Sequence, residues 1–305
     1  MPEGDTIYRA AAALRIALVG QPLVNVEARR LVGPLPEPGR VIETVDSHGK
    51  HLELTWDDGL VLHTHMRMTG SWHLYRPGER WRKSSQQARV TIEVPDWVAV
   101  CFNAPVVETY RQADRRRHPG MGALGPDLCG DDPDLAECLR RLSFYEDPAA
   151  PIHEVLLDQR IACGVGNVYK SEVLFACATS PFAPLDMLSN AERWALLETS
   201  SLLLRANLQH AGRITTTSAP GGLAVYGRTG KPCLRCGTAV RAGRFGEHAR
   251  TTYWCPVCQP DVARHDRERV EARHEPRPAA ARHDPPPGTH GALRTRRSVP
   301  GSRPH

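Results

Sequence analysis

The sequence of 305 residues predicts an α+β protein, in which an antiparallel β-sandwich with flanking helices precedes a helical region and a zinc-stapled β-hairpin. Three observations predict this fold class. Short apolar runs separated by turn residues fill the N-terminal part, as in antiparallel sheets. Helical periodicity replaces them over 133–210. Two Cys-x2-Cys pairs then follow within 233–258, a spacing typical of a zinc finger.

The first predicted element is a helix over 5–19. Ile7, Leu14 and Leu18 share one face of it, with Asp5 as its cap, and Gly20 ends it. Packed on a sheet, this helix would fix the amino terminus in place. The strands follow, and Asp57-Asp58-Gly59 is a hairpin signal between two of them. The predicted strands are Leu23–Ala28, Val41–Val45, His51–Trp56, Leu60–His65, Arg89–Val94 and Val98–Phe102.

The helical region is expected to bury Trp194, Leu197, Leu204 and Leu208 on one face. Beyond 259 the chain is rich in Arg, Pro and His and has few large apolar residues, so it is expected not to fold. Such a tail would attract DNA weakly or be an inert extension. The predicted divisions are 1–125 for the sandwich, 126–222 for the helical region, 223–260 for the zinc finger and 261–305 for the disordered tail.

Four cysteines form the metal motif: Cys233, Cys236, Cys255 and Cys258. Each pair converges on one ion from a tight knuckle, and four thiolates leave no coordination position for water, so the predicted zinc is structural. Two disulfides are the alternative. The chain has nine cysteines and no secretory signal, which favours a reducing cytosol and zinc.

The segment between the two cysteine pairs predicts a hairpin. Thr238–Val240 and Thr251–Trp254 are its expected strands, and 241–250 is its turn. An arginine on such a turn can clamp a DNA phosphate, and Arg250 is the candidate. Arg241 and Arg244 are expected to be ordinary solvated side chains.

The chain opens with Met1-Pro2-Glu3-Gly4. Removal of Met1 would expose the Pro2 amine, which is nucleophilic near neutral pH because an α-amino group loses its proton around pH 8. Attack on a sugar carbon would give an iminium, and Glu3 would serve in proton transfer. The alternative is an ordinary Met-Pro start without catalytic meaning.

A second glycine-containing motif lies at 164–169. Gly164 and Gly166 separate two short apolar helices, and Asn167 stands at the start of the second as its expected cap. Free amides at a helix N-terminus bind phosphate, to which Asn167 would add a donor.

These motifs together resemble the Fpg/Nei DNA glycosylases, and within that family the endonuclease VIII branch of actinobacteria. The resemblance rests on the Pro2-Glu3-Gly4 start, Gly164–Tyr169, Val225–Arg228 and Tyr253–Gln259, in that order. It implies a helix-two-turn-helix fold for 126–222. It also implies excision of oxidised bases from DNA, followed by cleavage of the abasic strand through β- and δ-elimination.

The resemblance also implies roles for individual residues. Pro2 is the expected nucleophile and Glu3 the acid/base. Lys50, in His48–Leu52, would stabilise phosphate or developing negative charge, although an exposed lysine at a strand end is the alternative. Arg250 is the fourth expected catalytic residue, and it would hold a phosphate. The expected DNA-binding residues are Asn167, Lys170, and Arg67 with Met68 as a wedge that fills the space of a flipped nucleotide.

Three departures from the family pattern bear on the substrate. Thr6 stands where most members have glutamate, so the supporting role of that carboxylate is in doubt. The Asp-Pro-Arg-Arg-Phe-Gly wedge of the guanine-type branch is absent near Phe102–Val107. Only Ile214–Gly222 fills the place of that branch's lesion-capping loop. Both absences favour oxidised pyrimidines over 8-oxoguanine, by analogy with the family.

The expected partner is double- or single-stranded DNA that contains oxidised bases or abasic sites, bound by a monomer in the cytoplasm at the nucleoid. The net charge of +5 is modest, and no segment has membrane length. The alternatives are a formamidopyrimidine/8-oxoguanine-type glycosylase, a non-catalytic reader of damaged DNA with the same fold, and a zinc-ribbon protein of unrelated fold.

Overall fold

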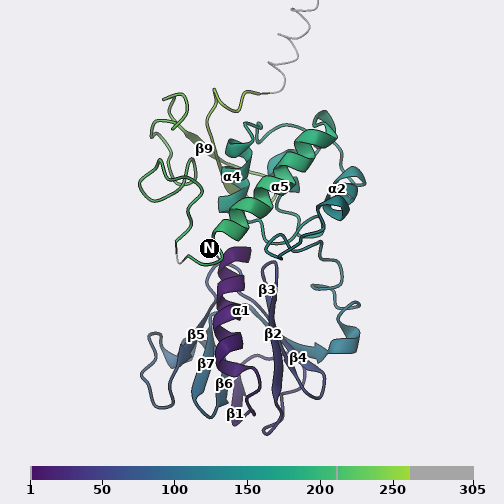
Figure 1. Cartoon of the computed structure of the whole chain (residues 1–305), viewed down its shortest axis with the longest axis vertical. Coiled ribbons are helices and arrows are strands. Elements are labelled where there is room, and N and C mark those ends of the chain that lie inside the picture. Colours follow the sequence, from purple (N-terminus) through teal and green to yellow (C-terminus); the bar gives the residue numbers. More distant parts are fainter. Residues whose placement is uncertain (1, 211, 262–305) are drawn as a thin grey trace, which may run out of the picture. The chain divides into compact units, whose positions relative to one another are not determined.

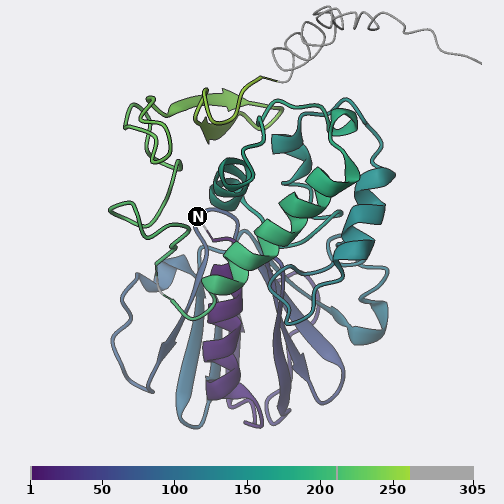
Figure 2. The ribbon, with the colours of Figure 1, turned by 45° about the horizontal axis from the view of Figure 1, so that its top comes forward.

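Two antiparallel four-stranded sheets form the N-terminal part of the protein. The computed structural model describes residues 2–210 and 212–261. One sheet has the order β1-β6-β7-β5 and the other β2-β3-β4-β8 (Figures 1 and 2). Their strands are β1 Asn25–Ala28, β2 Ile42–His48, β3 His51–Trp56, β4 Leu60–His65, β5 Ser71–Tyr75, β6 Ala88–Val94, β7 Trp97–Phe102 and β8 Val106–Arg111. The predicted sandwich is confirmed.

Strands β5 and β8 are additions to the predicted set. Strand β8 directly follows Pro105, and its outward side chains Glu108 and Tyr110 are polar, so it lacks the apolar run on which the predicted strands were based. It forms an edge of its sheet by pairing with β4, with Leu62 opposite Thr109 and His63 opposite Glu108.

Helix α1 (Gly4–Leu18) packs against both sheets (Figure 1). Its Ile7, Leu14 and Leu18 belong to the same core as Leu54 of β3 and Ile92 of β6, as its periodicity predicted. The predicted cap is wrong, because Glu3 occupies the N-cap position and Asp5 lies inside the first turn.

The helical part has its own core, built from α2 (Leu135–Ser143), α3 (Ile152–Val155), α4 (Asn167–Ala176) and α5 (Asn190–Ala206). Leu197 and Leu204 are buried there, and Leu208 packs against it from beyond the helix end, as predicted. Trp194 is 37% exposed, so its predicted burial is wrong. Single-turn 3-10 helices stand at η1 (Ser85–Gln87), η2 (Gln112–Asp114) and η3 (Leu185–Met187).

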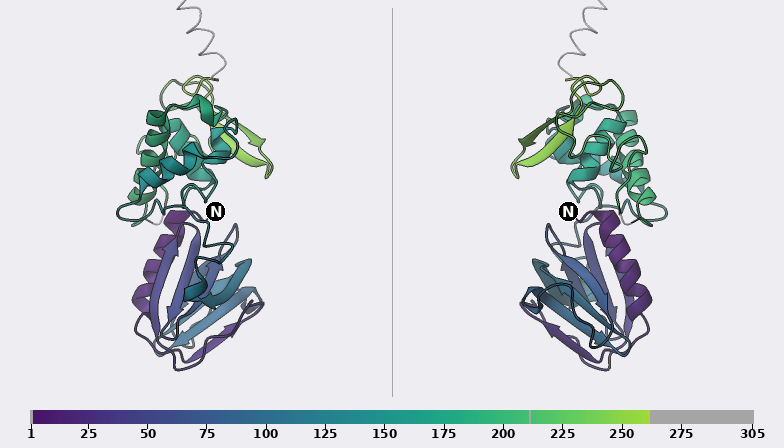
Figure 3. Two further views of the ribbon diagram at one scale, coloured as in Figure 1. Left: turned by 90° about the vertical axis from the view of Figure 1, so that its right-hand side faces the viewer. Right: turned by 90° about the vertical axis from the view of Figure 1, so that its left-hand side faces the viewer.

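The cysteine segment carries the hairpin β9 (Arg241–Phe245) and β10 (Arg250–Trp254), which stands out from the helices in Figure 3. The first strand therefore begins at Arg241 rather than at Thr238, and the turn is shorter than predicted. Phe175 of α4 joins Val225, Val240 and Cys255 in a small core, so the hairpin is fixed to the helical part.

The predicted tail over 261–305 lies outside the described residues, except for Asp261. Within 2–210 and 212–261, no helix combines the length and the apolar character that crossing a membrane requires.

Candidate active site

The carboxylate of Glu3 lies at the N-terminus of α4. Its Oε2 accepts hydrogen bonds from the backbone N–H groups of Gly166 at 3.1 Å and Tyr169 at 3.3 Å, and its Oε1 accepts one from Val168 at 2.8 Å. Glu3 is fully buried. A helix N-terminus favours negative charge, so this arrangement fixes the start of the chain against a helix more than 160 residues later.

Close backbone contacts at glycine make this arrangement possible. A Cβ on Gly166 would lie 2.4 Å from Glu3 Cδ. Gly4 donates its N–H to the carbonyl of Gly164 at 2.9 Å, and a Cβ on Gly4 would lie 2.8 Å from Gly164 Cα. Gly49, which precedes Lys50, has φ +57°, and a Cβ there would lie 2.5 Å from Cys163 Cβ. These glycines bring the amino terminus, the β2–β3 turn and the α4 junction together.

The prediction that the α4 amides bind phosphate is wrong for Gly166, Val168 and Tyr169, because Glu3 occupies them. Asn167 is also not the cap, since Gly166 takes that position. The Asn167 side chain instead donates from Nδ2 to the carbonyl of Thr251 at 2.8 Å.

Lys170 was expected to bind DNA, and its position corrects that expectation. It is fully buried, so it offers no surface to DNA in this structure. Its ammonium donates to Asn167 Oδ1 at 2.8 Å and to Thr252 Oγ1 at 2.9 Å. Burial lowers the pKa of Lys170 to about 8. The side chain thus ties α4 and Asn167 to strand β10.

Lys50 lies in the turn between β2 and β3, beside the amino terminus. Burial lowers its pKa to about 8; the Glu3 carboxylate opposes this shift, and the Arg250 cation adds to it. Lys50 is half-buried, which differs from the alternative of an exposed lysine at a strand end. Its charge lies in the field of both Glu3 and Arg250, which the sequence assigned to the same site.

Asp5 and Arg213 belong to the same site but were not predicted. The Asp5 carboxylate is buried and accepts hydrogen bonds from Arg213 at 2.8 and 2.9 Å, and it pairs with Arg9 at 3.3 Å. Thr6 Oγ1 accepts from Arg213 at 3.0 Å. Arg213 thus contacts Thr6, where the sequence departs from the pattern of the family that it resembles. Because Arg213 lies 208 residues from Asp5, no local pattern reveals the pair.

Arg250 and the two predicted wedge residues are exposed. Arg250 begins β10 next to the hairpin turn. Arg67 and Met68 lie in the loop between β4 and β5, where Met68 is 66% exposed and Arg67 has φ +44°. By contrast, the neighbouring Met66 is buried in the sandwich core. These positions are compatible with contacts to DNA.

Glu172 is a further buried carboxylate that sequence reasoning missed. It accepts backbone N–H groups from Ala224 at 2.8 Å, Val225 at 2.9 Å and Tyr226 at 2.8 Å, and Thr215 also donates its hydroxyl to it. A charged residue inside a buried helical turn was the available signal, because buried carboxylates need partners. Glu172 holds the segment that leads into the four-cysteine cluster.

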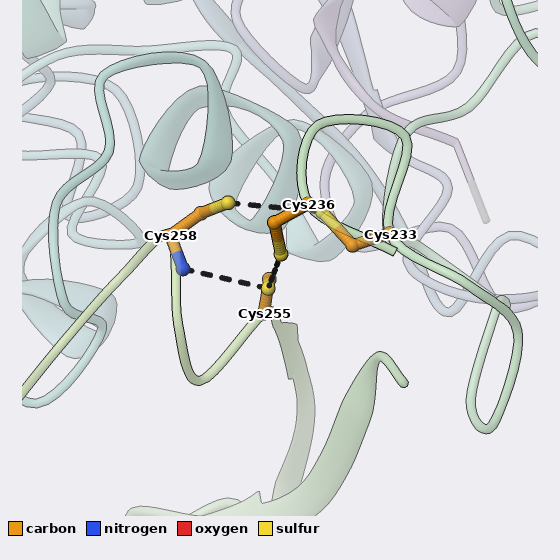
Figure 4. Close-up of side chains that lie close together, drawn as sticks. All are labelled: Cys233, Cys236, Cys255 and Cys258. Carbon is orange, nitrogen blue, oxygen red and sulfur yellow. Dashed lines mark hydrogen bonds between the residues drawn. The ribbon is translucent and has the colours of Figure 1, made fainter. Parts of the chain in front are cut away.

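The four motif cysteines converge, as Figure 4 shows. The sulfur atoms of Cys233 and Cys258 are 3.8 Å apart, and those of Cys236 and Cys255 are 3.5 Å apart. All nine cysteines of the chain are free, which excludes the alternative of two disulfides in this structure. Sulfurs around a tetrahedral ion with bonds of about 2.3 Å lie about 3.8 Å apart, so the cluster has the dimensions of a metal site.

Comparison with known proteins identifies two family domains. Residues 1–111 match the formamidopyrimidine-DNA glycosylase N-terminal domain, and residues 124–219 match the H2TH domain of the same glycosylase.

Two curated relatives are similar over most of their length. The probable endonuclease 8 2 of Streptomyces coelicolor is 42% identical over 86% of this chain and 95% of its own. The DNA-(apurinic or apyrimidinic site) lyase Nei2 of Mycolicibacterium smegmatis is 36% identical over 85% of this chain and 99% of its own. Among solved structures, Lactococcus lactis Fpg in complex with DNA containing an abasic site has a TM-score of 0.72 and 23% identity, over 85% of this chain and all of that one.

Proposed function

Because the chain belongs to the endonuclease VIII (Nei) branch of the Fpg/Nei family of DNA glycosylases, we propose that it removes oxidised bases from DNA and then cleaves the abasic strand. The observation that carries this proposal is the Glu3 carboxylate, which three amides of the helix-two-turn-helix region hold directly beside Pro2. That contact links the chain's amino terminus to a DNA-binding fold.

In the proposed reaction, Pro2 becomes the terminal residue once Met1 is removed. Its nitrogen forms a bond to the anomeric carbon of the lesion's sugar, and the bond from that carbon to the base breaks with its electron pair leaving on the base. Glu3 accepts the proton that the attacking amine releases. The lone pair of the Pro2 nitrogen then breaks the bond from the anomeric carbon to the ring oxygen, and that oxygen takes the proton back from Glu3. The iminium formed by this ring opening acidifies the neighbouring sugar protons. Loss of one and then of the second phosphate by β- and δ-elimination cuts both sides of the lesion.

The cations around this terminus support the second half of the reaction. Lys50 shares the electrostatic environment of Glu3 and Arg250, so a phosphate bound there would meet two positive charges. Asn167 is hydrogen-bonded to the same hairpin that carries Arg250, so we assign both residues to that phosphate. Arg67 and Met68 are the proposed wedge, and an exposed Met68 side chain can replace the stacking of a flipped nucleotide.

We further propose that the four-cysteine cluster binds one Zn²⁺. The spacing of its sulfurs and an all-thiolate donor set fit a closed tetrahedral site. Zinc would supply no chemistry to the reaction and would fix the hairpin that presents Arg250. A protein that acts on DNA in this way would work at the nucleoid in the cytoplasm, as a monomer.

Oxidised pyrimidines are the proposed preferred lesions. The segment 214–222 is short, and no residues replace the guanine-type wedge near Phe102–Val107. The competing function is a formamidopyrimidine/8-oxoguanine-type glycosylase. Single-turnover excision of thymine glycol, 5-hydroxycytosine and 8-oxoguanine separates the two, and faster removal of 8-oxoguanine would support the competitor.

Borohydride trapping on abasic DNA tests the reaction itself. Reduction of the iminium should crosslink the protein to DNA, and peptide mapping should place the adduct on Pro2. Lys50→Arg should keep the adduct on Pro2, whereas Glu3→Gln, which preserves the shape of the side chain, should reduce its yield. An adduct on Lys50, or no adduct in protein whose mass shows that Met1 is removed, would refute the proposal.

A further inference from the structure

A cluster of histidines and carboxylates lies on the outer face of the sheet β2-β3-β4-β8. His63 on β4 stands between Glu53 on β3 and Glu108 on β8, directly opposite both in the strand register. His118 reaches the same place from the segment that follows η2. Donor atoms of His63, Glu108 and His118 all lie within 4.8 Å of one another.

Two of these contacts are short. His63 Nδ1 is 2.8 Å from Glu108 Oε1, and His118 Nε2 is 3.3 Å from the same oxygen. The His63 side chain is 2% exposed, whereas that of Glu108 is 26% exposed. The three donors therefore converge from three segments on a point that is closed on the sheet side and open to solvent on the other.

The surrounding groups orient these side chains. His63 Nε2 is 2.8 Å from His51 Nδ1, so a hydrogen bond between the two rings fixes the His63 ring. The Tyr110 ring packs on His118, with centroids 4.6 Å apart. The Glu53 carboxylate is bound by Arg115, at 2.9 to 3.1 Å, which leaves Glu108 as the carboxylate available to an ion.

We propose that His63, Glu108 and His118 bind one divalent transition-metal ion of the Zn²⁺ class, at a second site separate from the four cysteines. Two imidazoles and one carboxylate are an established donor set for zinc, and imidazole selects such ions over Mg²⁺ and Ca²⁺. The bond between His51 and His63 is the outer hydrogen bond that metal-binding histidines usually make.

Binding would change the hydrogen bonds of the cluster. Ligand atoms of a tetrahedral ion with bonds of about 2.1 Å lie about 3.4 Å apart, so His63 and Glu108 would separate slightly. The His118 proton would move to Nδ1, because Nε2 would face the ion. The Gly120 N–H, which now donates to Nδ1 at 3.2 Å, would turn to solvent; this contact is exposed, so water can replace it.

The ion would attach a connecting segment to the sandwich. His118 lies in 112–123, between the two matched family domains, whereas His63 and Glu108 lie on the sheet. A filled site would therefore hold the start of this connection on the β-sandwich. The inference concerns structure alone and does not rest on the proposed reaction.

Zinc titration of the full-length protein tests this site. The number of tightly bound Zn²⁺ ions per chain should be measured by calorimetry and by elemental analysis after gel filtration. His118→Gln and Glu108→Gln should each bind one equivalent fewer than the wild-type protein. His210→Gln, which changes an exposed histidine beyond α5, is the matched control and should bind as the wild type does. The cysteines and the histidines beyond 261 are the same in all of these proteins, so any zinc that they hold cancels when the counts are compared.

Trypsin provides a second measurement, because Arg116 and Arg117 lie beside His118. Added Zn²⁺ should slow cleavage at these bonds in the wild type and in His210→Gln but not in His118→Gln, with fragments assigned by mass spectrometry. If the wild type binds no more zinc than His118→Gln, and zinc does not protect the segment, the site does not exist. A variant that fails to fold leaves the wild-type count and its protection as the deciding results.

Discussion

Gly166→Ala is expected to disrupt the link between the amino terminus and α4. The backbone at Gly166, with φ −124° and ψ −160°, is extended and open to alanine, so the effect must come from the added methyl group. A Cβ would lie 2.4, 2.5 and 2.7 Å from the Cδ, Cγ and Oε1 atoms of Glu3. Glu3 must therefore move, and its bonds to the amides of Val168 and Tyr169 weaken with it.

The magnitude follows from these contacts. Overpacking a well-packed site costs about 1–3 kcal/mol, and a hydrogen bond to a charged group contributes about 1.5–3 kcal/mol. The lower entropy of the unfolded alanine variant offsets about 0.4–1 kcal/mol. We expect a net loss of about 2–4 kcal/mol in the free energy of unfolding, with a strong drop in borohydride trapping because Pro2 moves together with Glu3.

Denaturant titration of a double-mutant cycle isolates the cause. Glu3→Ala removes the three atoms that the new methyl group would meet, so adding Gly166→Ala to that background should cost little, and the coupling energy should be about 2 kcal/mol or more. Gly212→Ala is the control, since no atom lies within 4 Å of its Cβ position and its φ is not positive. An equal cost of Gly166→Ala with and without the Glu3 side chain would refute the steric argument.

Three further predictions concern charge and metal. Because the pKa of Lys50 is about 8, the rate of strand cleavage should fall as the pH rises through 8. Lys50→Arg should shift this decline to higher pH. If the pH dependence of cleavage is the same in Lys50→Arg and in the wild type, the charge of Lys50 has no role in the reaction. The Cys255→Ser variant should bind one zinc fewer than the wild type and should bind DNA more weakly, while its circular dichroism still shows the folded sandwich. Wild-type protein purified without zinc would contradict this prediction. Lys170 has a folded pKa of about 8 against 10.5 in the unfolded chain, so the unfolded state binds more protons between these values. Wild-type stability should therefore rise relative to Lys170→Met between pH 8 and 10.5, and parallel pH curves would show that burial of the charge is not costly.

Sequence periodicity predicted the elements that have a regular apolar pattern. Strands β3 and β4 have the predicted bounds, and α1 buries the predicted side. Strand β8 escaped prediction because its outward residues join a polar cluster rather than solvent or an apolar core. The divisions at 125 and 222 stay predictions.

The roles of the predicted site residues stay predictions, and the structure corrects the contacts that were expected of them. Motif order brought Pro2, Glu3, Lys50 and Asn167 together, yet it assigned the α4 amides to phosphate. The structure gives those amides to Glu3, whose distance along the chain hides the contact from any local pattern. Arg213 was missed for the same reason, because its partner Asp5 is 208 residues away.

Helix α4 explains why such different parts of the chain meet at one place. Every residue from Asn167 to Phe175 is buried, although four of these nine are polar or charged. Buried polar groups need partners, so each of these side chains specifies a neighbour. Asn167 and Lys170 contact the hairpin at Thr251 and Thr252, and Ser171 accepts the N–H of Tyr253 at 3.4 Å.

The remaining contacts of α4 complete the same pattern. Glu172 holds the backbone of 224–226, and Arg235 of the cysteine segment donates to the carbonyls of Phe175 and Ala176 at the C-terminal end, where a cation is favoured. Glu3 occupies the opposite end with a negative charge. An apolar α4 of the same length would fill the core but would place neither the amino terminus nor the hairpin. The polar residues of this helix therefore specify the geometry of the site, and their substitution should affect DNA binding and trapping more than the stability of the sandwich.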